Sequence, residues 1–404
     1  MKLSLFSTLR GYRKEYLPKD IFSGIIIAAV SIPISMGYAQ ISGIPAVYGL
    51  YGSVLPILLF ALFSTSRQFI FGVDAAPAAI VGGALSTLGI AAESEAAMDY
   101  VPAIALFAGL WLFIFFLLHA DKIVDFISTP VMGGFISGIA VTIILMQIPK
   151  LMGSPAGSGE LLELAEHIFA AAKNISWLSL FMGLGALVLI RTFKKLAPKF
   201  PMAIVIMALG VLSTVVFHVN EKGVVLLQSV ERGLPSLVIP DFGNVDLTQA
   251  AGRGLMVAVV IMAETLLAEN TFAFRNDYKL NDRQEILACA AGNIAAAAVG
   301  CCPVNGSISR TSLNEQYGGK SQAVSITAGI TMALILLFGT CFIGYLPVPV
   351  LTAIVISALM DVVETHLAVR LFKVSRTEFY IFMAAGFSVL CLGTIYGAVS
   401  YTHL

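Results

Sequence analysis

Apolar residues occur along this chain in long runs that short polar stretches separate. A run of about 20 such residues is long enough to cross the hydrocarbon core of a bilayer as a helix. The pattern predicts an all-α polytopic membrane protein with fourteen membrane elements, at 21–40, 45–63, 75–90, 101–118, 126–148, 174–190, 201–217, 251–270, 284–300, 307–315, 321–342, 346–363, 377–390 and 391–404.

Two of these elements, 75–90 and 307–315, are short. Each follows an extended stretch that contains glycine or proline, at 69–73 and 300–304. Paired interruptions of this kind indicate a transporter site formed by two half-helices that meet near the bilayer midplane.

The composition agrees with a membrane location. Of the 404 residues, 58% are hydrophobic and only 12% are charged, with a mean hydropathy of +0.90, which excludes a soluble globular protein. The formal net charge is zero, so no basic surface indicates nucleic-acid binding.

The basic residues predict the orientation. The first 20 residues are basic and lack an apolar core, so they resemble a cytoplasmic segment rather than a cleavable signal peptide. With the N-terminus inside, eighteen basic residues fall in inner loops and five in outer ones, as the positive-inside rule requires. We therefore expect a multi-pass protein of the inner (plasma) membrane. The inner set is Lys2, Arg10, Arg13, Lys14, Lys19, Arg67, Lys122, Arg191, Lys194, Lys195, Lys199, Arg275, Lys279, Arg283, Lys320, Arg370, Lys373 and Arg376, and the outer set is Lys150, Lys173, Lys222, Arg232 and Arg253.

The remaining basic residue, Arg310, lies inside a predicted membrane element, after Pro303, Gly306, Ser307 and Ser309. A positive charge at the centre of a membrane helix costs roughly 2.5–3.5 kcal/mol on insertion scales, so it usually marks a functional site. An anion is the natural partner. The alternative is that Arg310 pairs only with a structural acid such as Glu264.

Glu264 is an acid inside the apolar run 257–263. An unpaired carboxylate there is expensive and tends to bind a proton, which makes Glu264 a candidate proton carrier. The alternative is a structural carboxylate tied to Arg310 or to backbone. Glu269 lies on another face of the same helix and is a candidate pore-side acid near its inner end.

We find no signature of an enzyme. The sequence contains no H-E-x-x-H zinc motif, no Asp-rich diphosphate motif and no serine with a plausible histidine partner. Five cysteines lack metal-ligand spacing and are interpreted as free buried thiols: Cys289, Cys301, Cys302, Cys341 and Cys391. We expect no cofactor and no metal.

Three motifs resemble the SulP/SLC26 family of anion transporters, in the same order and spacing over nearly the whole chain. They are Pro45–Ser53 with Ser64–Arg67 at the second helix, Ala263–Leu267 at the eighth, and Pro303–Thr311 with Gly318–Lys320 at the tenth. The resemblance implies an inverted repeat of seven plus seven helices. Helices one to four and eight to eleven would form a core domain, and helices five to seven and twelve to fourteen a gate domain.

The corresponding division is a cytoplasmic segment at 1–20, a first repeat at 21–200 and a second at 201–404. The resemblance places an anion between the N-termini of helices three and ten. Carried over to this chain, the site would use Tyr38, Ala75, Ala76, Glu264, Ser307, Ser309 and Arg310. Ser307 could instead only cap the tenth helix, and Tyr38 could be ordinary packing.

Asp74 is unusual at the start of helix three and is interpreted as an N-cap or as a second protonatable group beside Glu264. Sodium-coupled relatives carry a hydroxyl one turn after the helix-eight carboxylate. Here Ala268 occupies that position, so the resemblance favours a proton over sodium as the coupling ion.

The sequence predicts a secondary transporter of small inorganic or carboxylate anions, such as sulfate, bicarbonate or a dicarboxylate. A channel or exchanger of the same family would share every motif. A nucleobase:cation symporter of the same fold is disfavoured, because its helix-ten carboxylate is replaced by Arg310. The resemblance also implies a homodimer. It further implies a cytoplasmic STAS domain, and we expect none within these 404 residues. The terminal stretch 398–404 resembles translated adapter sequence, so we expect a truncated last helix.

Overall fold

The computed structural model describes residues 5–120, 129–157, 161–197, 200–230, 232–243 and 245–400, of which 129 and 392–400 are described by their backbone only. Lys2, Lys122 and Lys199 of the predicted inner set lie outside the described residues. So do the first residues of the expected element 126–148 and residues 401–404 of the last one.

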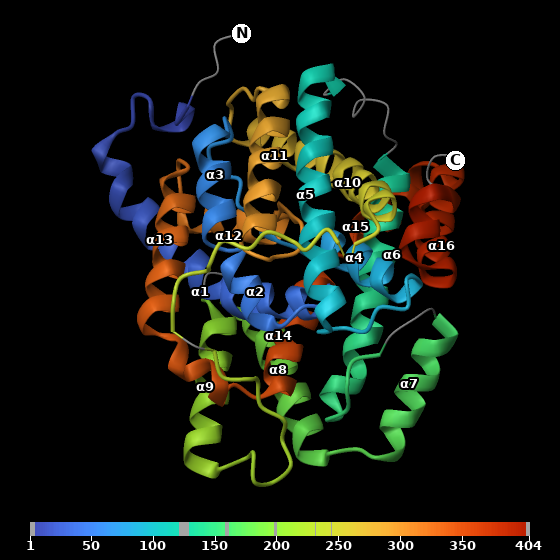
Figure 1. The fold of residues 1–404 in the computed structure, drawn as a ribbon. Helices are drawn as coiled ribbons and strands as arrows, with labels where there is room; N and C mark the ends of the chain where they lie inside the picture. Colours follow the sequence, from blue (N-terminus) through green and yellow to red (C-terminus); the bar gives the residue numbers. More distant parts are fainter. Residues whose placement is uncertain are drawn as a thin grey trace. The chain divides into compact units, whose positions relative to one another are not determined.

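The chain divides into two compact units, and each unit combines two separate stretches of sequence. Unit 1 comprises Met1–Ile127 and Leu234–Leu336, and unit 2 comprises Ser128–Gly233 and Leu337–Leu404. Each unit therefore receives the chain twice, and the helices can be followed along the sequence by colour in Figure 1, with α1–α5 and α10–α13 in unit 1 and α6–α9 and α14–α16 in unit 2. The division matches the expected grouping into a core domain and a gate domain.

Unit 1 contains the two short elements that the sequence singled out. Its elements are 3-10 helices at Ser7–Leu9 and Lys14–Tyr16, α1 Leu17–Ile41, α2 Ala46–Tyr51, α3 Leu55–Phe63, β1 Phe71–Val73, α4 Ala75–Thr87, α5 Glu95–Leu118, α10 Leu247–Arg275, α11 Asp282–Ala298, β2 Val304–Gly306, α12 Ile308–Tyr317 and α13 Ala323–Phe338. Polar residues begin the long helices. The Ser94 hydroxyl accepts from the Ala97 amide before α5, and the Asp246 carboxylate accepts from Thr248 and Gln249 before α10.

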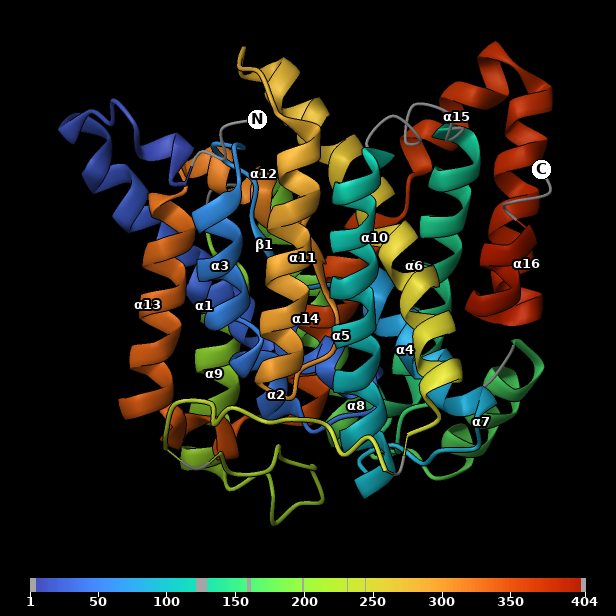
Figure 2. The same ribbon diagram turned by 45° about the horizontal axis from the view of Figure 1, so that its top comes forward.

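The helices of unit 1 pack into one apolar core. Helix α11 lies against both α5 and α3, and α10 lies against α5, as Figure 2 shows. A fully buried cluster joins α1, α3 and α13 through Ile27, Ile57 and Val324. The apolar face of each helix is thus covered by its neighbours, which holds the strands and short helices between them in place.

The strands β1 and β2 form an antiparallel pair in the middle of unit 1. Phe71 is opposite Gly306, Gly72 is opposite Asn305, and Val73 is opposite Val304. The Asn293 side chain on α11 holds β2, because its amide donates to the Val304 carbonyl and accepts from the Val304 amide, at 3.0 and 2.9 Å. The strand pair and Asn293 thus supply hydrogen-bond partners inside the protein for backbone groups of the interrupting stretches, as membrane depth requires.

Unit 2 consists of α6 Thr129–Leu151, α7 Leu161–Lys173, α8 Trp177–Leu196, α9 Met202–Phe217, a 3-10 helix at Thr340–Tyr345, α14 Val348–Val362, α15 Thr365–Val374 and α16 Arg376–Ser400. Helix α6 packs against α14 and α16, and α14 also contacts α8. Glycines allow the close approach of α6 and α16, because a Cβ on Gly134 would lie 2.1 Å from the Phe382 carbonyl oxygen.

Seven helical segments of the described chain are long and apolar enough to cross a membrane, and α4, α9 and α13 are shorter apolar helices. The expected element 45–63 matches one candidate membrane span, Ala46–Phe63, which is divided locally into α2 and α3 at Gly52–Val54. Two details of the predicted pattern were wrong. The expected pair 377–390 and 391–404 forms one helix, α16, up to Ser400. The amphipathic helices α7 and α15 were missed, because their charged residues place them among the predicted loops.

Candidate functional site

The two half-helices both begin at the strand pair. Helix α4 starts two residues after β1, and α12 starts two residues after β2. Because the strands are antiparallel, α4 leaves at the Val73–Val304 end of the pair and α12 at the Phe71–Gly306 end. A helix N-terminus carries roughly half a positive charge and unpaired backbone N–H groups. The N-termini of α4 and α12 thus lie at the two ends of one short strand pair, and the glycine- and proline-containing stretches at 69–73 and 300–304 predicted such a pair of half-helices.

Arg310 connects the two half-helices. Its side chain is only 2% exposed, and its Nη2 donates to the carbonyl oxygen of Val73, the last residue of β1, at 2.8 Å. Nη1 lies 3.5 Å from the Ser31 hydroxyl on α1, and Nε has no hydrogen-bond partner among the described residues. The guanidinium group from α12 thus lies directly at the start of α4.

No described carboxylate lies within 4 Å of Arg310. The ion pairs within the described residues are Arg191–Asp361, Lys194–Asp361 and Arg275–Glu315. The alternative that Arg310 is tied to Glu264 is therefore wrong for this structure. Asp74 interacts electrostatically with Arg310 from beyond ion-pair distance. A buried cation without a direct counter-ion can attract an external anion.

Gly72 makes the position of Arg310 possible. A Cβ atom at Gly72 would lie 2.9 Å from Arg310 Nη1, closer than normal van der Waals contact. The guanidinium therefore packs against bare backbone of β1, and a larger residue at position 72 would displace it.

Asp74 caps α4, which agrees with the first of its two interpretations. Its carboxylate accepts from the Ala75 amide at 2.9 Å, so this amide already has a partner. Ala75 and Ala76 are buried, with 3% and 4% exposure, and Pro77 follows without an N–H group. The start of α4 is consequently narrow and lined by small side chains.

Glu264 is buried on α10 and contacts the neighbouring strand. Its Oε2 accepts from the Asn305 amide at 2.6 Å, and the Asn305 carbonyl accepts from the Thr265 hydroxyl at 2.6 Å. Asn305 is the residue opposite Gly72 in the strand pair. Glu264 is therefore held to β2 by a side-chain amide, and it interacts electrostatically with Asp74.

The remaining predicted residues surround the start of α12. Ser307 occupies the N-cap position, but its hydroxyl makes no capping hydrogen bond and lies 3.3 Å from the Ser309 hydroxyl. The alternative that Ser307 only caps the helix is thus not supported. Tyr38 is buried on α1 at 2% exposure and interacts electrostatically with Arg310.

Sequence reasoning missed three contributors: Ser31, Thr265 and Asn305. Asn305 lies inside the stretch that drew attention to Arg310, and a buried amide in it was a usable signal. Ser31 and Thr265 lie in apolar helices where a lone hydroxyl is common. Glu269 is completely buried, and its predicted pore-side role stays a prediction.

Among the described residues, no group of three or more histidine, cysteine or acidic side chains is arranged to hold a metal ion. All five cysteines are free thiols. Cys289, Cys301 and Cys302 are buried as expected, whereas Cys341 and Cys391 are exposed because they lie near the surface of unit 2.

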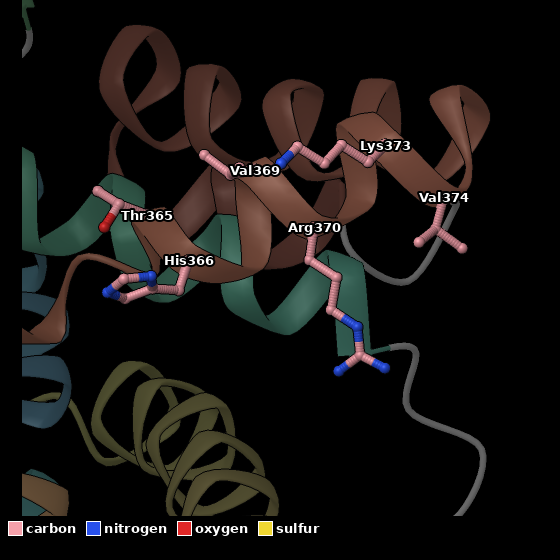
Figure 3. Close-up of a pocket in the computed structure, with 6 residues that line it drawn as sticks. All are labelled: Thr365, His366, Val369, Arg370, Lys373 and Val374. Atoms are coloured by element: carbon pink, nitrogen blue, oxygen red, sulfur yellow. The ribbon is translucent and has the colours of Figure 1, made fainter.

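A cavity of about 440 Å³ lies elsewhere, on α15 of unit 2. Figure 3 shows that all of its six lining residues come from that one helix, with Arg370 and His366 pointing away from the helix axis. None of them belongs to the predicted site.

The fold and the site define a class of protein. Apolar spanning helices, two half-helices that start at a buried strand pair and a buried arginine between them are the features of multi-pass membrane transporters built on broken helices. The chain belongs to the sulfate permease family, whose model matches residues 17–385. The members of this family are anion transporters and not enzymes.

The match with this chain covers a different share of each relative's length. A probable sulfate transporter of Mycobacterium tuberculosis is 26% identical over 395 residues, which are 98% of this chain and 70% of that protein. The transmembrane domain of the cyanobacterial bicarbonate transporter BicA has a TM-score of 0.86 at 20% identity, over 96% of this chain and 98% of that one. The murine anion transporter Slc26a9 has a TM-score of 0.88 at 18% identity, over 98% and 69%. The two structural similarities show the shared fold.

Proposed function

We propose that this protein is a secondary active transporter that carries a small inorganic or carboxylate anion, such as sulfate, bicarbonate or a dicarboxylate, together with a proton. The observation that carries the proposal is Arg310, a buried guanidinium that joins α12 to the start of α4 and has no described carboxylate within 4 Å. The names of the relatives, sulfate transporters and a bicarbonate transporter, agree with this substrate class.

The anion would bind at the strand pair. Two helix N-termini supply roughly half a positive charge each, and the guanidinium supplies a full one. Ser307 and Ser309 offer hydroxyl donors at the start of α12, and Ala76 lies at the start of α4. Tyr38 would close the site from α1. Helix termini and hydroxyls suit a compact anion better than a flat neutral ring, which favours this function over a nucleobase symporter.

Proton coupling would use Glu264. The Glu264 carboxyl group accepts a hydrogen bond from Asn305, and Asn305 is opposite Gly72 in the strand pair. Gly72 in turn packs against the Arg310 guanidinium, so Glu264 is linked to the surroundings of Arg310. With Asp74 also nearby, an incoming anion would meet two negative charges at the site. Protonation of Glu264 removes one of them, so that anion and proton bind more tightly together than either does alone. Asp74 is a second candidate for the proton, and Ala268 disfavours a sodium site.

Transport would proceed by alternating access. In this proposal unit 1 carries the anion and moves as a body relative to unit 2. The hydrogen bonds that hold the strand pair and both half-helices all lie within unit 1, so the binding site would remain intact during such a movement. We further propose an inner-membrane location with a cytoplasmic N-terminus, and a homodimer.

The test is uptake of labelled sulfate, bicarbonate and a dicarboxylate by proteoliposomes under an imposed pH gradient. We expect accumulation of one of these anions by the unaltered protein. Glu264→Gln should abolish accumulation driven by the gradient, because the amide cannot carry a proton. Glu221→Gln, which changes an exposed acid in a turn of unit 2, is the matched control and should behave like the unaltered protein.

Undiminished accumulation by Glu264→Gln would remove Glu264 as the proton carrier. Saturable one-for-one exchange of anions that ignores the pH gradient would identify an exchanger, and flux that does not saturate would identify a channel.

A further inference from the structure

A second buried acid on α10 is not explained by anion binding. Glu269 lies five residues after Glu264 and is completely buried, and neither of its carboxyl oxygens has a hydrogen-bond donor among the described residues. Five residues rotate the helix by about 140°, so the two acids lie on different faces of α10. An ionised carboxylate in such a place, without donor or cation, costs several kcal/mol.

The neighbour of Glu269 is Glu285 on α11, which is also completely buried. Glu285 has three donors from the residues that follow α3. The Ser64 hydroxyl donates to its Oε2 at 2.7 Å, and both the amide and the hydroxyl of Thr65 donate to its Oε1. A carboxylate with several donors is stabilised in its charged form. Glu285, which has three donors where Glu269 has none, is therefore better suited than Glu269 to be the ionised member of the pair.

Among the described residues no cation forms an ion pair with Glu269 or Glu285, and the basic residue beside the pair in sequence, Arg283 on α11, donates from its Nε to the Phe116 carbonyl. The titratable groups that face it are Asp282 and Cys289 on α11 and Tyr278 in the α10–α11 loop. Arg67 lies over the Tyr278 ring, with its Cζ atom 5.5 Å from the ring centroid. Two adjacent carboxylates in a low-dielectric site cannot both be charged.

We propose that Glu269 and Glu285 form a second proton-binding site in unit 1, in which a protonated Glu269 donates a hydrogen bond to ionised Glu285. The proton supplies the donor that both oxygens of Glu269 lack in the structure. The shared proton joins α10, which carries Glu264, to α11 and to the end of α3. This site is separate from the anion site, and the proposal holds whether or not Glu264 couples transport to a proton.

Loss of this proton would place two negative charges in contact inside the unit. The folded protein binds the proton more tightly than the unfolded chain does, so the stability of the fold falls as the pH rises. Glu269→Gln replaces the protonated acid with an amide that can donate to Glu285 permanently. We expect this variant to keep its stability at alkaline pH where the unaltered protein loses it.

The first experiment detects the proton directly by infrared spectroscopy of the full chain in lipid at neutral pH. A protonated carboxyl group has a carbonyl band that an ionised one lacks. The Glu264→Gln background removes the signal that Glu264 could add. We expect the band in this background, its loss on adding Glu269→Gln, and its persistence on adding Glu285→Gln, because Glu269 carries the proton. Asp74 could add a band of its own, so the decisive quantity is the change that Glu269→Gln causes. Absence of the band from the Glu264→Gln protein, or an undiminished band in the Glu269→Gln double variant, would overturn the proposal.

The second experiment measures thermal unfolding from about pH 6 to about pH 9, in sodium and in choline salts, with Glu315→Gln as a matched control on a partly exposed ion pair of the same unit. The unaltered protein should lose at least about 3 °C of Tm relative to Glu269→Gln over this range, and equally in both salts. If the Tm of the unaltered protein and the Tm of Glu269→Gln change equally with pH, the proposal that Glu269 binds a proton is contradicted. Stabilisation that requires sodium would show that a metal cation occupies the pair in place of the proton.

Discussion

Arg310 owes its position to contacts that a lysine cannot reproduce. The planar guanidinium reaches the Val73 carbonyl with one nitrogen and Ser31 with another, and it packs against the bare backbone of Gly72. A lysine has one compact ammonium group and cannot make both contacts in the same plane. The geometry of the site therefore depends on arginine itself, and its charge alone is not enough.

We predict that Arg310→Lys raises the KM for anion uptake by about tenfold to a hundredfold, because hydrogen bonds to charged groups contribute about 1.5–3 kcal/mol. Arg310→Gln, which also removes the charge, should abolish saturable uptake. Labelled-anion uptake in proteoliposomes provides the measurement. Equal KM values for the lysine variant and the unaltered protein would show that Arg310 does not contact the anion.

Tyr12 attaches the N-terminal segment to α1 through a hydrogen bond. Its hydroxyl donates to Asp20 Oδ2 at 2.9 Å, and Asp20 also accepts from the Lys320 amide and the Ser321 hydroxyl. Burial, together with the bond to Asp20, raises the pKa of Tyr12 from 10.0 to about 12. The segment before α1 is thus fastened to the start of α13 through one carboxylate.

We predict that Tyr12→Phe lowers Tm by about 1–3 °C at neutral pH, the size expected for one partly exposed hydrogen bond. The pKa of Tyr12 is higher in the fold than in the unfolded chain, so its stabilisation is complete below pH 10.0 and is lost as the pH rises through about 12. The Tm difference between the two proteins should shrink over that window. A constant difference, or an equal loss in the control Tyr380→Phe, whose side chain is exposed, would contradict this assignment.

At the scale of the elements, the strand pair depends on a glycine that faces an aromatic ring. A Cβ at Gly306 would lie 1.9 Å from Phe69 Cε1, and Phe69 is completely buried, so the ring cannot move away freely. The neighbouring Phe71 is also fixed, because its ring stacks on Phe60 with the centroids 4.4 Å apart. The strand pair is therefore rigidly packed on both sides.

We predict that Gly306→Ala lowers Tm by several degrees and nearly abolishes uptake, because overpacking of a core costs about 1–3 kcal/mol and shifts β2 with its Asn305. Gly185→Ala is the control. It lies in α8 with open space around it, and alanine there should be neutral or slightly stabilising. Full activity of Gly306→Ala would show that the strand pair tolerates displacement.

Sequence patterns predicted some of the helices and missed others. The half-helices could be predicted because glycine and proline shorten the apolar runs before α4 and α12, and those residues act locally. The helices α7 and α15 could not, because their charged faces resemble loops when hydropathy alone is considered. The division of 45–63 into α2 and α3 has local signals that hydropathy does not register, because Gly52 follows α2 and Pro56 lies in the first turn of α3.

The same limit applies to the site. The residue types of Arg310 and Glu264 stand out in apolar helices, so both could be named from the sequence. Their partners could not, because Asn305 is 41 positions from Glu264 and Val73 is 237 positions from Arg310. The pairing of Glu269 with Glu285 likewise joins two helices, and a pattern along one helix does not predict it.

At the scale of the whole molecule, the sequence enters unit 1 twice, and each passage contributes one strand and one half-helix. The proposed anion site is thus assembled from residues more than 200 positions apart, so both halves of the chain would be needed for one site. Composition and hydropathy predicted the membrane location, while the grouping into two units followed from the family resemblance.

The most direct test of the proposed anion site is an anomalous difference map from crystals grown with selenate, a heavy-atom analogue of sulfate. We predict a peak at the strand pair, within hydrogen-bonding reach of Arg310 and Ser309 and near the start of α4. A peak confined to the basic residues of α15, or no peak at the strand pair in a protein that transports selenate, would contradict the proposed site.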